Sequence, residues 1–310
     1  MPARKLTVVD ISWLWIPVTI AAAAAQAGRN AVQRSLTATL GTLGATQVRF
    51  IYGFPFALLF LAAVLAATGE PALSINGRYL AFICAGALVQ ILATALMLAA
   101  MRERAFVVVI AWTKTEPIQV AVFGFAVLGD ALTLGGAAAV LVATVGVVLM
   151  SVKPGVGKAS LESARPVLLG IVSGACFAMA AVAFRGAILS LDGGSFLLKA
   201  TWTLAWSLGI QVLMLAAWMA CFDRRLLVAC LRAWRASLGG GLLGALASQG
   251  WFIGFALTAA VHVRTLGLVE VLFAQVLSRR VFAHDTSARE WAGIVLIVGG
   301  VCLLMLLGNA

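Results

Sequence analysis

Ionisable side chains occur at six positions inside strongly apolar stretches of this 310-residue sequence: Arg49, Lys114, Glu116, Lys199, Arg264 and Glu270. A charge in such surroundings is costly unless it is paired or faces water, so each position is a candidate for function. Lysine and arginine donate hydrogen bonds to carboxylate and phosphate groups, whereas a glutamate accepts from an ammonium group or exchanges a proton. The alternative is that these groups pair with one another and only set the register of the helices.

Lys114 and Glu116 stand two residues apart, so a regular helix places their side chains about 200° apart around its axis. They cannot form a direct pair in that geometry. The cations Arg49 and Lys199 could reach the glutamates, Glu270 included, at the centre of a helix bundle. The spacing therefore predicts that each charge has its partner in another part of the sequence.

Pro117 follows these charges and interrupts the hydrogen bonding of a helix, because proline has no backbone N–H. The carbonyl of Thr113 loses its usual donor, and the helix is predicted to kink. Inside lipid such a carbonyl must be satisfied by protein or water. The hydroxyls of Thr113 and Thr115 are suited to this task, and Trp112 supplies a flat apolar wall nearby. The segment is therefore a candidate pathway lining.

Uncharged polar side chains inside the apolar segments form a second group of candidates. Gln26 and Asn30 are four residues apart and share one helix face. Gln90, and Gln249 with Trp251, are further candidates, for which hydrogen bonds between helices are an alternative explanation. The candidate substrate and proton pathway comprises Glu116, Glu270, Arg49, Lys114, Lys199, Arg264, Trp112, Thr115, Pro117, Gln26, Asn30, Gln90, Gln249 and Trp251.

The composition excludes a soluble domain and indicates a membrane protein. Hydrophobic residues make up 63% of the chain and charged residues 11%, and the mean hydropathy is +1.07. Soluble domains are about a quarter charged, because their surface must be solvated. The apolar runs predict an all-α protein of about ten transmembrane helices. The expected ranges are 13–34, 44–67, 78–101, 105–128, 133–152, 166–189, 195–222, 237–260, 265–282 and 290–307, with a polar linker over 153–165 between halves 1–152 and 166–310.

Several functional classes are disfavoured by the sequence. The net charge of +11 does not indicate nucleic-acid binding, because the cations lie between apolar runs at predicted helix ends. Five scattered cysteines form neither a disulfide framework nor a metal motif. Sequence motifs for metal, phosphate-loop or nucleophilic catalysis are missing, so we expect no enzyme activity, no cofactor and no metal. Asp10 and the long apolar run after it favour a retained first helix over a signal peptide.

The two halves of the sequence correspond to each other. An offset of 154 aligns Glu116 with Glu270, and an offset of 150 aligns Arg49 with Lys199. Matching charges inside apolar segments are harder to obtain by chance than matching apolar residues. Each half carries an odd number of predicted helices, so the two copies would enter the membrane from opposite sides as an inverted repeat.

One group of motifs resembles a known family. The motifs are Thr115-Glu116-Pro117, Leu128-Gly129-Asp130, Gly146 to Met150, Val269-Glu270, Ser287 and Gly299-Gly300. On these residues the chain resembles the drug/metabolite transporter (DMT) superfamily, in its EamA-like branch, over essentially its whole length. The resemblance implies ten helices as two inverted five-helix repeats, and an exporter that alternates access between them. The acidic residue usual in the turn after the fourth helix is Asp130 here, whereas His284 takes that place in the second half.

The expected function is secondary active transport, by resemblance export, of a small zwitterionic or anionic metabolite such as an amino acid. The mixture of buried charges favours such a substrate. The alternatives are an efflux carrier for cationic drugs and a non-transporting membrane scaffold. The expected partners are a small-molecule substrate, the lipid bilayer and protons as coupling ion, for a monomer or homodimer in a bacterial inner membrane. The count of loop lysines and arginines places the termini outside the cytoplasm, whereas the resemblance places them inside.

Overall fold

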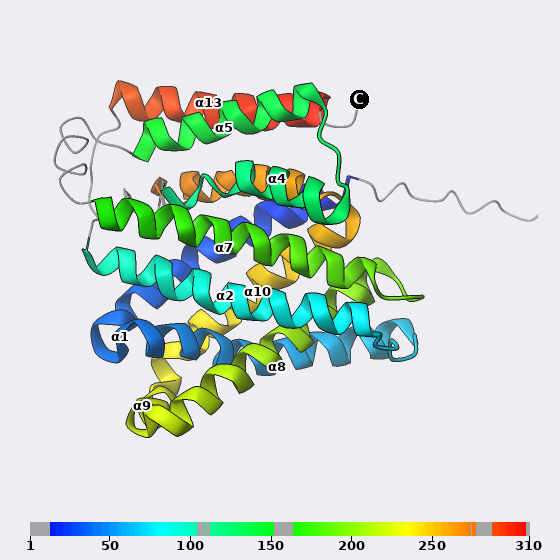
Figure 1. Cartoon of the computed structure of the whole chain (residues 1–310), viewed down its shortest axis with the longest axis vertical. Helices are drawn as coiled ribbons and strands as arrows, with labels where there is room; N and C mark the ends of the chain where they lie inside the picture. Colours follow the sequence, from blue (N-terminus) through cyan, green and yellow to red (C-terminus); the bar gives the residue numbers. More distant parts are fainter. Residues whose placement is uncertain are drawn as a thin grey trace, which may run out of the picture.

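The chain folds as an assembly of α-helices (Figure 1). The structure, a computed structural model, describes residues 13–103, 109, 112–151, 164–273, 275–276 and 287–307. Over these residues all regular secondary structure is helical, which confirms the predicted all-α class. The helices are α1 (Trp15–Thr68), α2 (Gly77–Glu103), α4 (Glu116–Leu128), α5 (Leu134–Ser151), α7 (Ala164–Leu189), α8 (Phe196–Phe222), α9 (Arg224–Arg232), α10 (Trp234–Leu257), α11 (Ala260–Leu266), the 3-10 helix η1 (Gly267–Val269) and α13 (Ala288–Leu307).

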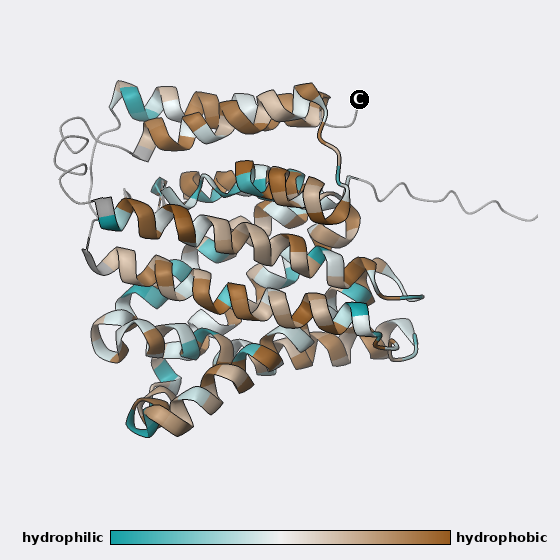
Figure 2. Ribbon diagram, in the orientation of Figure 1, coloured by the Kyte–Doolittle hydropathy of each residue, from teal (hydrophilic) through white to brown (hydrophobic). Residues whose placement is uncertain are grey.

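Most of these helices are suited to lipid. Within the described residues, six are long and apolar enough to cross a membrane: Trp15–Thr68, Gly77–Met101, Arg165–Leu189, Phe196–Phe222, Trp234–Leu257 and Ala288–Leu307. Large apolar side chains also lie on the outer surface, where Leu134 is 90% and Phe222 75% exposed. Figure 2 shows hydrophobic residues along the length of the outer helices. An apolar surface this extensive needs a covering of lipid. The protein is a multi-pass integral membrane protein.

α1 is broken at Gly41, whose φ of 65° and ψ of −175° are not helical. A φ in this left-handed region is accessible to glycine because it has no Cβ. Figure 1 shows the dark blue first limb of α1 meeting its lighter blue second limb in a bend. The limbs correspond to the predicted helices 13–34 and 44–67. The bend allows residues of both limbs to line a common cavity.

Two of the predicted helices are interrupted. The expected helix 105–128 contains a turn at residues 114 and 115, and α4 begins after it at Glu116. In the expected helix 265–282, α11 is followed by η1 and by helical residues 270–273. The prediction of continuous helices is wrong at these points, because hydropathy does not register the loss of a few backbone hydrogen bonds. Residues 153–163 of the predicted linker and parts of both ranges lie outside the described residues, whereas residues 164 and 165 already belong to α7.

Close helix packing depends on glycine at several contacts. α1 packs on α10, α2 on α7, and α5 on α13, the last pair lying side by side at the top of Figure 1. A Cβ built at Gly293 would lie 2.6 Å from the Cβ of Met150, and one at Gly300 would lie 2.6 Å from the backbone nitrogen of Ala143. Small residues of this kind let helix backbones approach each other within the membrane.

Replacing Gly300 with alanine is expected to lower the unfolding temperature, because the backbone of α5 blocks the added methyl group. Overpacking of a core costs about 1–3 kcal/mol. Gly299→Ala is the matched control, since a Cβ there meets nothing within 4 Å. Thermal unfolding of both variants in detergent measures the difference. Equal unfolding temperatures would contradict the close packing of α5 on α13.

Candidate functional site

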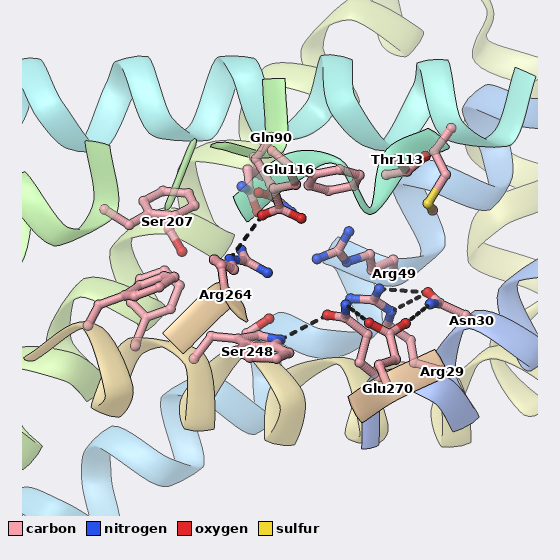
Figure 3. Close-up of a pocket in the computed structure, with 18 of the residues that line it drawn as sticks. Arg29, Asn30, Arg49, Gln90, Thr113, Glu116, Ser207, Ser248, Arg264 and Glu270 are labelled. Atoms are coloured by element: carbon pink, nitrogen blue, oxygen red, sulfur yellow. Dashed lines mark hydrogen bonds and ion pairs between the residues drawn. The ribbon is translucent and has the colours of Figure 1, made fainter. Parts of the chain in front are cut away.

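A polar cavity lies among the apolar helices (Figure 3). Its volume is about 40 Å³, which is room for about three water molecules. Both limbs of α1 line it, together with α2, the turn before α4, α7, α8, α10 and α11. The structure brings nine of the predicted pathway residues to this cavity: Gln26, Asn30, Arg49, Gln90, Lys114, Glu116, Trp251, Arg264 and Glu270.

Glu270 is the most densely contacted charge in the cavity, and only 3% of it is exposed. Its carboxylate forms an ion pair with Lys114. It also accepts hydrogen bonds of 2.7 Å each from Nε2 of Gln26 and Nδ2 of Asn30. Gln26 is itself held in place, because its Oε1 accepts from Nε1 of Trp251 at 2.8 Å. Three donors from two different elements thus converge on one buried carboxylate.

Glu116 pairs with Arg264 on the other side of the cavity (Figure 3), where Oε1 and Nε lie 3.1 Å apart. These two atoms are aligned too poorly for a hydrogen bond, and neither has another such partner among the described residues. The guanidinium of Arg264 also lies over the rings of Trp251 and Phe255, with its Cζ 4.9 and 5.4 Å from their centroids. Aromatic faces stabilise a cation of this kind. Arg264 is therefore positioned by two aromatic rings as well as by Glu116, whereas Oε1 of Glu116 has only the ionic contact with Arg264.

The prediction that Lys114 and Glu116 find separate partners is confirmed. The partners differ from those suggested, however. Arg49 donates a hydrogen bond to the hydroxyl of Thr94, and Lys199 donates to the carbonyl of Leu191 at 2.7 Å. Lys199 is an early residue of α8, so its long side chain reaches back to the chain that follows α7 and stays away from the cavity.

Both glutamates stand where a helical segment begins after an interruption. Glu116 is in the first turn of α4, and Glu270 starts the helical residues that follow η1. The N–H groups at the N-terminus of α4 favour the negative charge of Glu116, whereas the backbone N–H of Glu270 bonds to carbonyls of η1. Broken helices with such ends at mid-membrane are typical of substrate and ion sites in secondary transporters. The arrangement therefore resembles the charged sites of such transporters.

Pro117 directly follows the interruption at residues 114 and 115, where the sequence predicted a kink. It lies in the first turn of α4, where the missing N–H removes no helical bond. The hydroxyls of Thr113 and Thr115 donate to the carbonyls of Val109 and Trp112, at 3.0 and 2.8 Å. These hydroxyls therefore bond to carbonyls that precede the interruption. Neither of them donates to the carbonyl of Thr113, although the sequence had suggested this.

The remaining predicted residues lie outside the cavity lining. Gln249 donates to Oγ1 of Thr201 at 2.8 Å and joins α10 to α8. Trp112 packs against α7, where a Cβ at Gly170 would lie 2.8 Å from the Cβ of the tryptophan. The predicted pathway residues outside the lining are Lys199, Trp112, Thr115, Pro117 and Gln249.

Arg29 is the main cavity residue that the sequence interpretation missed. It lies near the end of the predicted helix 13–34 and is not among the predicted site residues, yet only 3% of its surface is exposed. Its Nε and Nη2 donate to Oδ1 of Asn30 at 3.3 and 2.7 Å, whereas Nη1 has no hydrogen-bond partner within the described chain. The spacing of Gln26, Arg29, Asn30 and Gln33 was the available signal, because these positions form one polar helix face. Ser207 and Ser248 are further cavity residues that it missed.

A third ion pair joins three helices at one end of the bundle. Arg185 of α7 donates from Nε and Nη2 to Asp130 at 2.9 and 3.3 Å. Its Nη1 donates to the carbonyls of Phe255 and Thr258 at 2.7 and 2.6 Å. Asp130 follows the left-handed C-cap Gly129 of α4, as the predicted turn requires. One guanidinium thus ties α7 to the end of α4 and to the end of α10. His284, its predicted counterpart, lies outside the described residues.

The site belongs to a multi-pass α-helical membrane protein with charged groups enclosed among its spans. No protein-family model and no curated protein matches the chain. A solved structure described as "Crystal structure of protein" superposes with a TM-score of 0.69 and 15% sequence identity, over 96% of this chain and 99% of its own. The chain therefore shares the fold of that structure over nearly its full length. At this identity the likeness concerns the fold alone.

Proposed function

We propose that the protein is a secondary transporter that carries a small anionic or zwitterionic metabolite across the membrane through the central cavity. The observation that carries the proposal is the cavity lining, in which four cations and two carboxylates are enclosed by apolar helices. Charges in this position are costly, and they are retained where they bind a substrate or an ion. The excess of cations favours an anionic group on the substrate over a cationic drug.

A membrane scaffold is the competing function. In a scaffold each buried charge should be paired, and a central cavity has no function. Lys114 and Arg264 fit that requirement, since both pair with glutamates. Arg29 and Arg49 do not, because no carboxylate of the described chain lies within ion-pair distance of either. These two arginines and the cavity support transport.

Alternating access is the mechanism that we propose. The cavity has room for about three waters, so a metabolite enters only when surrounding helices move apart. The interruptions before Glu116 and Glu270 are natural hinges, because few backbone hydrogen bonds are lost when they bend. They also recur 154 residues apart, which supports two related halves. We accordingly propose membership of the EamA-like branch of the DMT superfamily, export as the direction and a bacterial inner membrane as the location.

The test is reconstitution after a metabolite screen. Cells that overexpress the protein and cells that lack it are compared for metabolites inside and outside. Each hit is then measured in proteoliposomes with and without a pH gradient. We expect saturable transport above that of protein-free liposomes, and faster transport when the gradient is imposed. Unchanged metabolite levels, together with no transport of any hit, would contradict the proposal.

A further inference from the structure

Two buried cations of the central cavity have no carboxylate partner. The cavity lining contains Arg29, Arg49, Lys114 and Arg264 against Glu116 and Glu270. Each glutamate is matched by one cation in an ion pair. The two arginines of α1 are therefore left over, although only 3% and 8% of their surfaces are exposed. A buried charge without a partner is strongly unfavourable. An anion bound in the cavity would compensate these two arginines.

Both arginines also have free hydrogen-bonding capacity. A guanidinium carries five N–H donors in a planar fork. Arg29 directs two of its nitrogens at the single Oδ1 of Asn30, and its buried Nη1 is without a hydrogen-bond partner in the described residues. Arg49 donates from Nη1 to Oγ1 of Thr94 at 2.9 Å. Figure 3 shows the Arg49 guanidinium between the Glu116 pair and the Glu270 group. A guanidinium fork of this kind matches the oxygens of a carboxylate or phosphate.

The two arginines stand where the central cavity meets a second, smaller one. The second cavity lies between the two limbs of α1 and α10, and Arg29 and Arg49 line both. Its polar lining includes Gln33 and Ser237, whose Oε1 and Oγ lack hydrogen-bond partners in the part of the chain that is described. Buried polar atoms without partners are rare unless water or a ligand reaches them. The guanidinium groups of Arg29 and Arg49 are thus shared by the two cavities.

We propose that Arg29 and Arg49 form a single anion site, and that the substrate of this carrier is a small organic dianion. This inference rests on the proposed transport function and specifies its substrate class. Two positive charges remain after the glutamates are paired, and a dianion neutralises both. A dicarboxylate places one carboxylate on each fork, whereas a phosphate monoester shares its oxygens between them. The amide groups of Gln90 and Gln211 are available for the rest of the molecule.

The experiment measures binding to the full chain, purified in detergent, by ligand-dependent shifts in unfolding temperature. The probes are succinate, glycerol 3-phosphate, monomethyl succinate, alanine and choline. We expect succinate or glycerol 3-phosphate to bind at least tenfold more tightly than monomethyl succinate, alanine or choline, because each charged hydrogen bond contributes this much. Preference for succinate identifies a dicarboxylate, and preference for glycerol 3-phosphate identifies a phosphate monoester.

Charge-changing variants separate this site from a structural role. Arg49→Gln and Arg29→Gln each remove one positive charge, so the preference for succinate over monomethyl succinate should fall about tenfold or vanish. Arg49→Lys keeps the charge and should keep the preference, with weaker binding. Arg78→Gln is the matched control, because Arg78 is exposed at the start of α2 and lies outside both cavities. It should bind as the wild type does.

The outcomes distinguish this inference from the transport proposal. Binding of dianions without transport in proteoliposomes would keep the anion site and overturn the transport function. Transport of alanine or choline by a protein that does not bind dianions would overturn the anion site and keep the transport function. A preference for succinate that is unchanged in both glutamine variants would also overturn the assignment of the site to Arg29 and Arg49.

Discussion

Replacing Glu270 with glutamine is expected to reduce transport by about 100-fold or more and to lower the unfolding temperature. The substitution leaves Lys114 without its carboxylate and turns an amide toward the donors of Gln26 and Asn30. Removing one partner of a buried pair costs about 3–5 kcal/mol, and about 1.4 kcal/mol corresponds to a factor of ten. Transport in proteoliposomes and thermal unfolding in detergent measure the two effects.

Lys114→Met is the informative companion of this variant. Glu270 then keeps the hydrogen bonds from Gln26 and Asn30. The loss of stability should therefore be smaller than in Glu270→Gln. The double variant should lose less stability than the sum of the losses in the two single variants. The Lys114–Glu270 contact is lost in each single variant and is therefore counted twice in that sum. Strictly additive losses would show that the ion pair contributes no coupling energy.

Glu116→Gln is expected to abolish transport, by about 100-fold or more, while the protein remains folded. The carboxylate is the ionic partner of Arg264, which keeps its contacts with Trp251 and Phe255 when the charge of Glu116 is removed. The fold should tolerate the change for that reason, whereas the charge balance of the cavity does not. If Glu116 carries the coupling proton, it also makes the transport rate depend on the pH gradient. This dependence should then disappear in Glu116→Gln.

Glu290→Gln is the matched control for this second variant. Glu290 accepts from the backbone N–H of Ser287 at 2.9 Å and helps to begin α13, outside the cavity. Its variant should transport at the wild-type rate, with the same response to a pH gradient. Normal transport by Glu116→Gln, measured in the same vesicles, would remove Glu116 from the mechanism.

The membrane class and most helix positions follow from local properties of the sequence. Hydropathy over about 20 residues reports whether a segment is stable in lipid, whatever its neighbours are. It therefore identified both limbs of α1 and the helices α2, α5, α7, α8, α10 and α13, with ends that differ by a few residues. Hydropathy did not register the interruptions at residues 114–115 and 267–269, because these segments remain apolar.

The candidate site was partly accessible from the sequence, because a buried charge is conspicuous wherever it occurs. Helical spacing was sufficient to separate Lys114 from Glu116 and to place Gln26 beside Asn30. It was misleading for Lys199, which the repeat alignment paired with Arg49. Lys199 lies only four residues after Ser195, the N-cap of α8, so its ammonium group can reach the end of the span.

By itself, the sequence determined that this chain is a helical membrane protein with costly charges in its apolar segments. Only the tertiary structure decided which charges meet. Glu270 is 156 residues from Lys114 and 240 from Asn30, and these contacts depend on how distant helices rotate and pack against one another. The same packing turned Arg29 from an apparent helix-end charge into a buried cavity residue. Hydropathy and helical period describe one segment at a time, whereas a binding site is formed where several segments pack together.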